Sequence, residues 1–289
     1  MQTLRPGEVG CLLGGTFRES VTIRRGGSRG APLTLTSAPG RRARIVGTLY
    51  VADSANNVVI SHLNLDGRDG RHSPSPQING DHVTLRGNNI TNGHTGICLI
   101  LGGSFERYGR ARDTLVEGNR IHDCGRLPAT NHDHGIYVEG TNGARIVGNL
   151  IYDNADWGIH LYPDAQHTYI AHNVIDGNGH GILFAGEGAN EEYERAYASN
   201  NNVVVRNVIT NSTIGANVES WWGGPVGRGN VARRNCLWNG ANGNVDRADG
   251  GFVPNDNTVA RPLFVNRGRK DFRLRPGSRC AGAGVSRSR

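Results

Sequence analysis

The chain has few aromatic residues, one methionine and a single lysine. Of its 289 residues only 6% are aromatic, and Lys270 is the one lysine. No apolar run approaches the roughly 18 residues that a membrane-spanning helix needs, and Met1 to Leu12 has neither the charged start nor the apolar stretch of a secretory signal. Glycine is abundant instead, at 43 residues, which is typical of a chain that turns every few residues. We therefore predict no membrane span and no fold of ordinary helices.

The formal net charge of +7 comes almost entirely from arginine. An excess of positive charge favours acidic partners. The arginines are spread along the chain without a dense basic run or a recognised binding motif, so we predict no nucleic-acid binding. An acidic polysaccharide built from uronic acids fits the charge equally well. A basic surface can also serve solubility alone.

Five cysteines show no paired spacing of the kind that marks zinc or thioredoxin sites. Cys236 lies in the last regular repeat and Cys280 in the tail that follows it. We expect these two to form a disulfide that clamps the tail if the protein is exported. An odd count leaves one thiol over.

One short pattern returns six times: an apolar residue, two variable positions, asparagine, one variable position and a second apolar residue. The copies are Leu85 to Ile90, Val116 to Ile121, Ile146 to Ile151, Ile170 to Ile175, Val204 to Ile209 and Ala232 to Leu237. Neighbouring copies lie 24 to 34 residues apart. Bounded but uneven spacing is typical of a solenoid, whose coils return to the same place while loops on the rim differ in length. We predict that the asparagines stack at a turn and hydrogen-bond along the solenoid axis.

A second element in each coil begins with glycine and then alternates apolar residues with others. Its copies are Gly96 to Ile100, Gly135 to Glu139, Gly158 to Tyr162, Gly181 to Ala185 and Gly215 to Glu219. A period of two predicts strands whose apolar residues stack inward between coils. We divide the single solenoid into first coils at 1–42, regular repeats at 43–257 and a C-terminal cap at 258–289.

Several segments resemble the right-handed parallel β-helix repeat proteins of the pectate-lyase-like superfamily. They are His134 to Gly140, Asn149 to Asn154, Gly158 to Pro163, the opening stretch Leu4 to Leu35 and the closing stretch Asp271 to Ser278. The resemblance implies an all-β, single-stranded, right-handed parallel β-helix of a secreted bacterial protein that acts on polysaccharides. The superfamily includes lyases, epimerases, glycoside hydrolases and non-catalytic proteins. Because residues 3–15 already look like a first coil, we expect a leader or an N-terminal cap to precede this chain.

The outward residues of the second element form two predicted columns. The first holds Cys98, Tyr137, His160, Leu183 and Asn217, and the second holds Ile100, Glu139, Tyr162, Ala185 and Glu219. Long insertions follow two of these strands, at 102–113 and 186–201, and we expect them to form two walls beside a low floor. Histidine and tyrosine are acid–base and sugar-stacking residues. We therefore predict a catalytic site on this floor, with an extended polymer lying along it.

The first hypothesis is a polysaccharide lyase or C5-epimerase that acts on an acidic, uronate-containing polymer. The resemblance to lyases implies a base, an acid and a group that neutralises the substrate carboxylate. The predicted catalytic residues are His160 or His134 as base and Tyr162 or Tyr137 as acid or base. The predicted neutraliser is Arg107, or a Ca²⁺ ion held by Asp133, Glu139 or Asp164. The predicted substrate contacts are Arg107, Glu139, Asp164, Glu187, Asn217, Glu219, Trp221 and Trp222.

Three alternatives remain open at this point. A glycoside hydrolase needs two carboxylates at a workable separation, and Glu187 with Glu219 or Glu139 with Asp164 are the possible pairs. A non-catalytic rod would bind glycan through the same aromatic patch, and Trp221 and Trp222 can either stack on sugars or cover the core. Convergence of His132, His134 and His160 would form a transition-metal site. Several related lyases use a lysine base, which cannot be carried over because Lys270 lies in the tail. We expect a monomer with no cofactor other than Ca²⁺.

Overall fold

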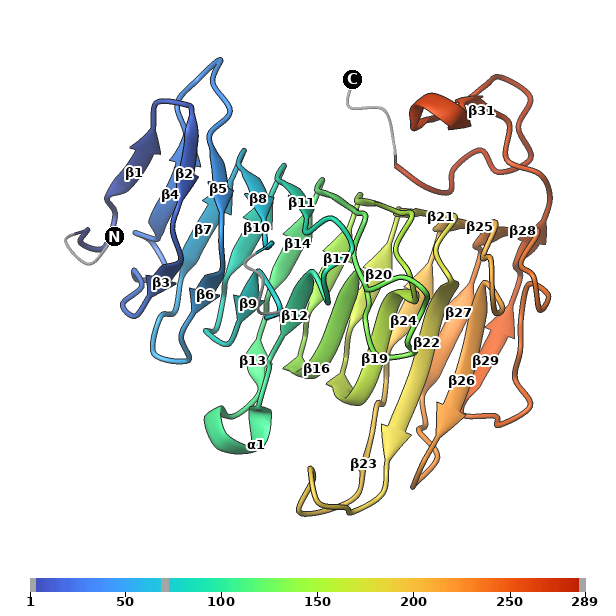
Figure 1. The fold of residues 1–289 in the computed structure, drawn as a ribbon. Helices are drawn as coiled ribbons and strands as arrows, with labels where there is room; N and C mark the ends of the chain where they lie inside the picture. Colours follow the sequence, from blue (N-terminus) through green and yellow to red (C-terminus); the bar gives the residue numbers. More distant parts are fainter. Residues whose placement is uncertain (1–3, 69–72, 286–289) are drawn as a thin grey trace.

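The computed structural model describes residues 4–68 and 73–285, and these form a parallel β-solenoid. Three parallel sheets run the length of the rod, because each coil contributes one strand to each sheet in turn (Figure 1). Strands of neighbouring coils hydrogen-bond to one another in register. The predicted β-helix is confirmed. The predicted first coil begins at Thr3, which lies outside the described residues, and the first described strand begins at Val9.

The strands of each sheet follow one another along the rod. The first sheet contains β1 (Val9–Leu12), β4 (Leu33–Ser37), β7 (Val58–Ser61), β10 (Thr84–Arg86), β14 (Leu115–Glu117), β17 (Arg145–Val147), β20 (Tyr169–Ala171), β24 (Val203–Val205), β27 (Asn230–Arg233) and β29 (Phe252–Asn255). The second contains β2 (Thr16–Arg18), β5 (Arg44–Val46), β8 (Asn64–Asp66), β11 (Asn89–Thr91), β15 (Arg120–His122), β18 (Leu150–Tyr152), β21 (Val174–Asp176), β25 (Val208–Thr210), β28 (Cys236–Trp238) and β30 (Thr258–Val259). The third contains β3 (Val21–Ile23), β6 (Leu49–Val51), β9 (Gln77–Ile78), β12 (Leu99–Leu101), β16 (Ile136–Asn142), β19 (Trp157–Gln166), β22 (His180–Glu187) and β26 (Val218–Trp222), with β13 (Ala111–Arg112) beside β16 and β23 (Tyr197–Ala198) antiparallel to β22.

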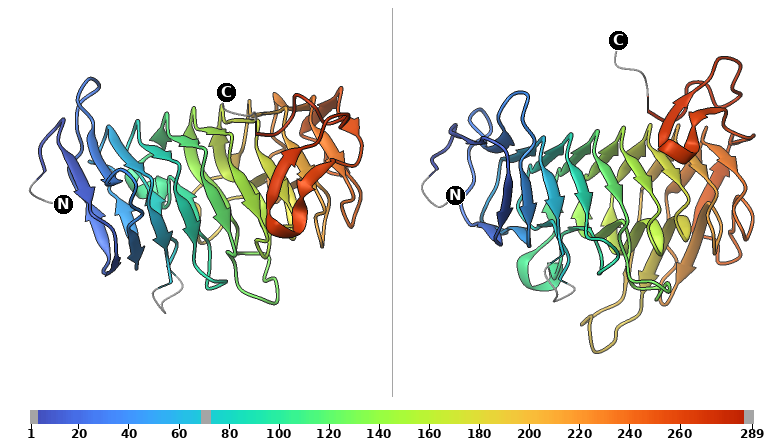
Figure 2. Two further views of the ribbon diagram at one scale, coloured as in Figure 1. Left: turned by 90° about the horizontal axis from the view of Figure 1, so that it is seen from above. Right: turned by 45° about the horizontal axis from the view of Figure 1, so that its top comes forward.

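The core is a continuous apolar column enclosed by the three sheets. Each strand alternates inward apolar residues with outward ones, so like residues stack from coil to coil. In the third sheet Ile136, Ile159 and Ile182 lie in register and are fully buried. Figure 2 shows how regularly the coils repeat from the N-terminal end to the C-terminal end.

The asparagines of the repeat form the predicted ladder inside the turn between the first two sheets. Each Nδ2 group donates to the Oδ1 atom of the next asparagine, at 2.9 to 3.1 Å, from Asn88 through to Asn257. The same Oδ1 atoms accept from the backbone N–H groups of the preceding coil. The ladder therefore holds the turns at a fixed spacing, which confirms its structural role.

Two predicted strands of the third sheet are wrong in register by two residues. Leu99 pairs with Ile136 and Val218 pairs with Ile182, whereas the glycine alignment had placed Ile97 and Ala216 at those positions. Cys98 comes just before β12, and its side chain is fully buried in the core instead of facing outward. The loop before the third-sheet strand has seven residues in these two coils, 92–98 and 211–217, against 13, four and three before β16, β19 and β22. A glycine therefore cannot mark the same place in every coil.

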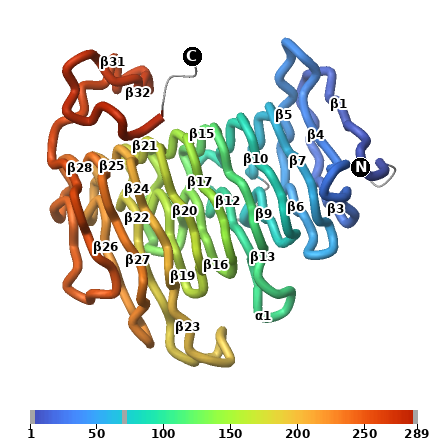
Figure 3. Tube along the Cα trace, turned by 180° about the vertical axis from the view of Figure 1, so that it is seen from behind, coloured from blue at the N-terminus to red at the C-terminus, as the bar shows by residue number. Residues whose placement is uncertain are grey.

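The C-terminal tail folds back along the rod as a hairpin of β31 (Phe264–Asn266) and β32 (Asp271–Leu274), joined by a 3₁₀ turn at Arg267–Arg269 (Figure 3). The predicted disulfide between Cys236 and Cys280 is present and attaches this tail to the last coils. No helix in the described ranges is long and apolar enough to cross a membrane.

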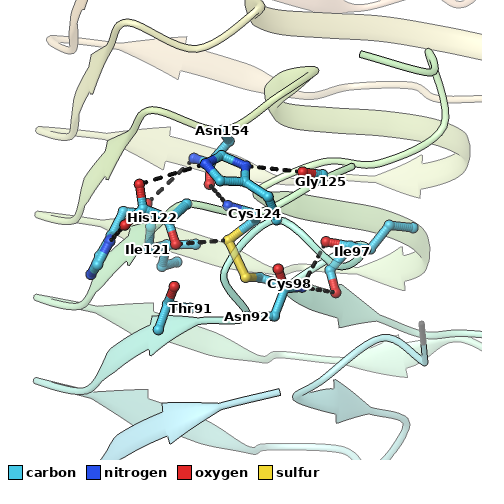
Figure 4. The surroundings of a disulfide bond; sticks show 12 residues. Thr91, Asn92, Ile97, Cys98, Ile121, His122, Cys124, Gly125 and Asn154 are labelled. Atoms are coloured by element: carbon cyan, nitrogen blue, oxygen red, sulfur yellow. Dashed lines mark hydrogen bonds and ion pairs between the residues drawn. A yellow bond between two sulfur atoms is a disulfide. The ribbon is translucent and has the colours of Figure 1, made fainter. Parts of the chain in front are cut away.

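A second disulfide, which the sequence spacing did not reveal, joins Cys98 to Cys124. It links one coil to the next, where Asn154 and Gly125 surround it (Figure 4). Cys11 is the remaining thiol and is exposed at the N-terminal end. The tie between Cys98 and Cys124 lies in the two coils that lead into the long strands of the third sheet.

Candidate functional site

The third sheet widens in the middle of the rod, where β16, β19 and β22 have seven, ten and eight residues. Their outward side chains form one row across neighbouring strands, with Tyr137, His160, Leu183 and Glu219 in register. A second row precedes the strand glycines: Trp157 lies beside His180, and the ring of His134 lies 5.3 Å from that of Trp157. Register between coils thus gathers residues that are distant in sequence.

A cavity of about 650 Å³ lies over these rows, and we call it the floor cavity. Its aromatic and imidazole lining consists of His132, His134, Tyr137, Trp157, His160, Tyr162, His180 and Trp221. Its carboxylates are Glu187, Glu192, Glu219, Asp246 and Asp249. No arginine or lysine of the described chain lines it. The molecule is basic overall, yet this cavity has an acidic lining.

His134 and His160 form a buried pair at the centre of the floor. His134 Nε2 and His160 Nδ1 are 2.8 Å apart, so one ring donates a hydrogen bond to the other. Burial disfavours the charged imidazolium, which lowers the pKa of His134 from 6.5 to about 3 and that of His160 well below 6.5. The other nitrogens, His134 Nδ1 and His160 Nε2, are buried without a hydrogen-bond partner among the described residues. Both rings are therefore neutral at physiological pH.

The pKa values of the floor tyrosines are raised, whereas those of the floor histidines are lowered. The Tyr162 hydroxyl donates to Glu187 Oε2 at 2.7 Å, and its ring stacks on His160 with centroids 5.2 Å apart. Burial and the neighbouring carboxylate of Glu187 raise the pKa of Tyr162. Burial also raises the pKa of Tyr137, with a further contribution from the neighbouring Tyr193. Both phenols keep their protons and can donate hydrogen bonds.

Glu139 lies in an irregularity of β16 between Val138 and Gly140. Only 9% of the residue is exposed, and its Oε1 accepts the backbone N–H of Ser104 at 2.8 Å. Burial raises its pKa from 4.5 to about 7, although the hydrogen bond from Ser104 acts in the other direction. Glu139 thus ties the insertion at 102–113 to the floor and titrates near neutral pH.

Glu219 is the most highly coordinated carboxylate of the cavity. Its Oε1 accepts from the Trp157 indole and lies 2.7 Å from His180 Nδ1, while its Oε2 accepts the backbone N–H of Ala216 at 3.1 Å. The rings of Trp157 and His180 stack with centroids 4.5 Å apart. Three donors from three neighbouring coils therefore converge on one side chain.

We expected the two insertions to form two separate walls, but in the structure they contact each other. Helix α1 (Phe105–Tyr108) carries Glu106, whose Oε1 accepts from the Tyr197 hydroxyl at 2.6 Å, and Phe105 packs edge-on against the same ring. Both segments project from the same side of the rod (Figure 1). Glu187 and Glu192 of the second insertion line the floor cavity, whereas no residue of the first insertion does.

Five predicted substrate contacts do not line the cavity, and Glu139, described above, is one of them. Arg107 is exposed on α1, where its guanidinium covers the ring of Tyr108, and Asp164 is buried in an ion pair with Arg110. The predicted outward position of Asn217 is wrong, since it is fully buried and bonds to Ser212, Trp238 and Asn244. Trp222 packs against the core, whereas Trp221 is 47% exposed and lines the cavity.

The predicted calcium ligands do not fit a cation site in this geometry. The carboxylate of Asp133 forms an ion pair with Arg126 and also accepts from the Thr130 hydroxyl, so a metal there would meet a guanidinium. Glu139 is held by a different partner, Ser104. Across the parts of the chain that the structure describes, no three His, Cys, Asp or Glu side chains are arranged to hold a metal, and this includes the histidines at 132, 134 and 160. We derive no step through a metal.

The sequence reading missed Trp157, His180 and the carboxylates at 192, 246 and 249. A signal was present for the first two, because each stands immediately before a strand glycine, as His134 does. Only the residues after each glycine were compared between coils. Asp246 and Asp249 lie in an irregular loop after the last third-sheet strand, where no repeat predicts their position.

Comparison with known proteins agrees with this architecture. The sequence model of the family described as "Right handed beta helix region" matches residues 77–257. The solved structure of pectate lyase Pel9A aligns with a TM-score of 0.58 at 16% identity, covering 99% of this chain and 85% of that one. A rhamnogalacturonan lyase aligns with a TM-score of 0.53 at 12% identity, covering 98% and 93%. At such identities the likeness shows the fold alone. No curated protein matches the sequence.

Proposed function

Since this chain belongs to the family of right-handed β-helix proteins, we propose that it is a carbohydrate-active enzyme that acts on a polysaccharide in the floor cavity. One observation carries the proposal: burial holds imidazoles neutral and tyrosines protonated side by side on an open aromatic floor. Environments that separate the pKa values of neighbouring groups in this way are typical of acid–base catalysis.

The reaction that suits these groups best is β-elimination on a uronate. A neutral histidine takes the C5 proton, and the electron pair of the C5–H bond forms the C4–C5 double bond as the C4–O bond breaks. The departing oxygen takes the proton of Tyr162, which regains one from solvent, and the histidine releases its proton to solvent. His134, His160, Tyr137 and Tyr162 were the predicted catalytic residues, and all four line the cavity. A C5-epimerase would use the same groups but return a proton to the opposite face of C5.

The charge of the cavity limits the substrate. Without arginine or lysine in its described lining, negative charge on the sugar carboxylate must be met by hydrogen bonds from neutral phenols such as Tyr137. The five carboxylates of the lining repel a densely charged chain. We therefore expect a polymer in which uronates alternate with neutral sugars, and not a continuous polyuronate.

A glycoside hydrolase is the second candidate, because Glu187 and Glu219 line the same cavity. Hydrolysis needs one carboxyl group as acid and a second as nucleophile or base. Both are already engaged in this structure, Glu187 by the Tyr162 hydroxyl and Glu219 by the Trp157 indole. We rank elimination first because the floor offers neutral imidazoles and protonated phenols in direct contact.

We also propose that the protein works outside the cytoplasm. Two disulfides, at Cys98–Cys124 and Cys236–Cys280, are typical of proteins that fold in an oxidising compartment. Quantification of free thiols in protein from the native host tests this expectation. One reactive thiol per chain, that of Cys11, supports it, and five argue against it.

Incubation with a panel of acidic and neutral polysaccharides tests the function. Ultraviolet absorbance of an unsaturated uronate identifies elimination, whereas new reducing ends without that absorbance identify hydrolysis. We expect Tyr162→Phe to lower turnover by about 10²-fold or more. Tyr169→Phe is the matched control, because Tyr169 lies on the first sheet beneath Arg145. Binding without any turnover by the wild type would identify a non-catalytic glycan-binding protein instead.

A further inference from the structure

We propose that His180 and Glu219 form a carboxylate–histidine dyad that serves as the general base of the floor cavity. This inference rests on the proposed function and deepens it, because it assigns the proton acceptor to a histidine that the sequence reading missed. His180 begins β22, and Glu219 comes from β26 of the next coil. The two strands are paired in parallel, with Glu219 opposite Leu183, and both side chains line the floor cavity.

The hydrogen bonds of Glu219 determine which nitrogen of His180 carries the proton. The Trp157 indole and the Ala216 backbone N–H can only donate, so they favour the ionised carboxylate. An ionised carboxylate is an acceptor alone, and the 2.7 Å bond to His180 must therefore be donated by Nδ1. Neutral His180 consequently has its lone pair on Nε2, as a base requires.

His180 is better suited to take a proton than the buried pair. Its side chain is 15% exposed and lines the cavity, whereas the Nε2 atom of His160 is buried. Glu219 stabilises the imidazolium that forms on His180, while His160 has only the neutral ring of His134 at 2.8 Å. The buried pair thus completes the aromatic floor, and the C5 proton of the elimination step goes to His180 Nε2.

A glycine makes room for the dyad. A Cβ atom on Gly215 would lie 1.9 Å from His180 Nδ1 and 2.9 Å from Glu219 Oε2. Gly215 lies directly beside the His180–Glu219 contact. Its backbone is not in the left-handed region, so an alanine there is not strained by its φ angle. Gly215→Ala therefore displaces the pair without removing either ionisable group.

Kinetics test the base assignment. We expect His180→Gln to lower kcat by about 10²-fold to 10³-fold with little change in KM, since a positioned base contributes that much to the chemical step. Glu219 acts through His180 as a positioning residue, so Glu219→Gln should lower kcat by about 10-fold to 100-fold. Gly215→Ala should reproduce the effect of Glu219→Gln. His167→Gln, in an exposed turn, and Glu191→Gln, in the exposed insertion, are the matched controls.

The split between kcat and KM separates positioning from a merely structural role. Loss of the carboxylate leaves the Nδ1 proton of His180 without its acceptor, so Glu219→Gln should lower kcat with little change in KM. A Glu219→Gln variant in which only KM changes, or a His180→Gln variant with wild-type kcat, would overturn the dyad.

Nitrogen NMR of the imidazoles provides a readout that needs no substrate. In the wild type we expect a protonated Nδ1 and an unprotonated Nε2 for His180 at neutral pH, and loss of this single tautomer in Glu219→Gln. A wild type that turns over no polysaccharide overturns the proposed function, and the base role with it, even if NMR shows this tautomer. Turnover together with the opposite tautomer, or with a tautomer that Glu219→Gln does not change, overturns the dyad alone.

Discussion

The asparagine ladder and the floor cavity are built on the same coils but treat polar atoms in opposite ways. In the ladder the amide of Asn149 bonds to Asn119, Asn173 and the Val116 carbonyl, so its donors and acceptor are satisfied. In the floor, one nitrogen of His134 and one of His160 are buried with no partner among the described residues. The ladder stabilises the rod, whereas the floor keeps buried polar atoms unpaired, a departure from the usual pairing that sets it apart from the rest of the core.

The two regions also differ in how they follow the repeat. The ladder lies at a turn that each central coil forms alike, with an asparagine at the same position. The floor exists only where β16, β19 and β22 are longer than the other strands of the third sheet. The comparison teaches that function in this solenoid arises where the coils depart from their common length.

The largest expected effect comes from breaking the ladder at its centre. Asn149→Ala removes the acceptor of the Asn119 backbone N–H and the donor to Val116, leaving both buried without partners. We expect a loss of about 4 kcal/mol in the free energy of unfolding, measured by urea denaturation. Asn242→Ala, at an exposed position, should cost less than about 0.5 kcal/mol. Equal losses in the two variants would contradict the structural role of the ladder.

Replacing Glu139 tests whether burial raises the pKa of this carboxyl group. Its pKa of about 7 in the folded protein exceeds the ordinary 4.5, so the folded state binds the proton more tightly. The stability that this carboxyl contributes is complete below about pH 4.5 and is lost as the pH rises through about 7. Glu139→Gln cannot ionise and should therefore be more stable than the wild type by about 3 kcal/mol above about pH 8.

The same urea titrations check this prediction across the pH range. The advantage of Glu139→Gln should vanish below about pH 4.5, where the wild-type carboxyl is protonated in both states. Glu191→Gln serves as the control, because Glu191 is exposed in the insertion at 186–201. A constant difference between Glu139→Gln and the wild type at all pH values would contradict the raised pKa.

Acidification should affect the buried histidines in the opposite direction. The pKa of His134 falls from 6.5 to about 3 on folding, so the folded state binds fewer protons. The stability that its neutral ring contributes is complete above about pH 6.5 and is lost as the pH falls toward about 3. Between about pH 7 and about pH 5 we expect the wild type to lose about 2 kcal/mol that His134→Gln does not lose. Parallel curves for the two proteins would refute the assignment, and Asn242→Ala should follow the wild-type curve.

The smallest effect on stability is expected at Trp221. Its replacement should weaken oligosaccharide binding while leaving the free energy of unfolding almost unchanged. Because 47% of this side chain is exposed, Trp221→Ala should change the free energy of unfolding by less than about 0.5 kcal/mol. Its ring faces the floor cavity near Tyr162, so affinity for an oligosaccharide should fall measurably in calorimetry. Tyr108→Ala, on α1 outside the cavity, should leave that affinity unchanged.

Much of the fold was predictable because its signals are local and repeated. The asparagine pattern predicted the ladder, and the alternation after Gly135, Gly158 and Gly181 predicted strands that the structure contains. The register failed in the coils of Gly96 and Gly215, where loop length changes before the strand. A shift of two residues preserves which side faces inward, so the fold prediction survived while Glu219 moved from the column of Tyr162 to that of His160.

The sequence by itself determined that this chain winds into a β-helix and that its central coils carry histidine and tyrosine on one face. Only the tertiary structure decided that Glu219 meets His180, that Asp164 belongs to Arg110, and that the cavity has an acidic lining. The physical reason is that backbone repetition follows from local residue patterns, whereas contacts between coils depend on register. Register is set by the loops, whose lengths follow no repeat.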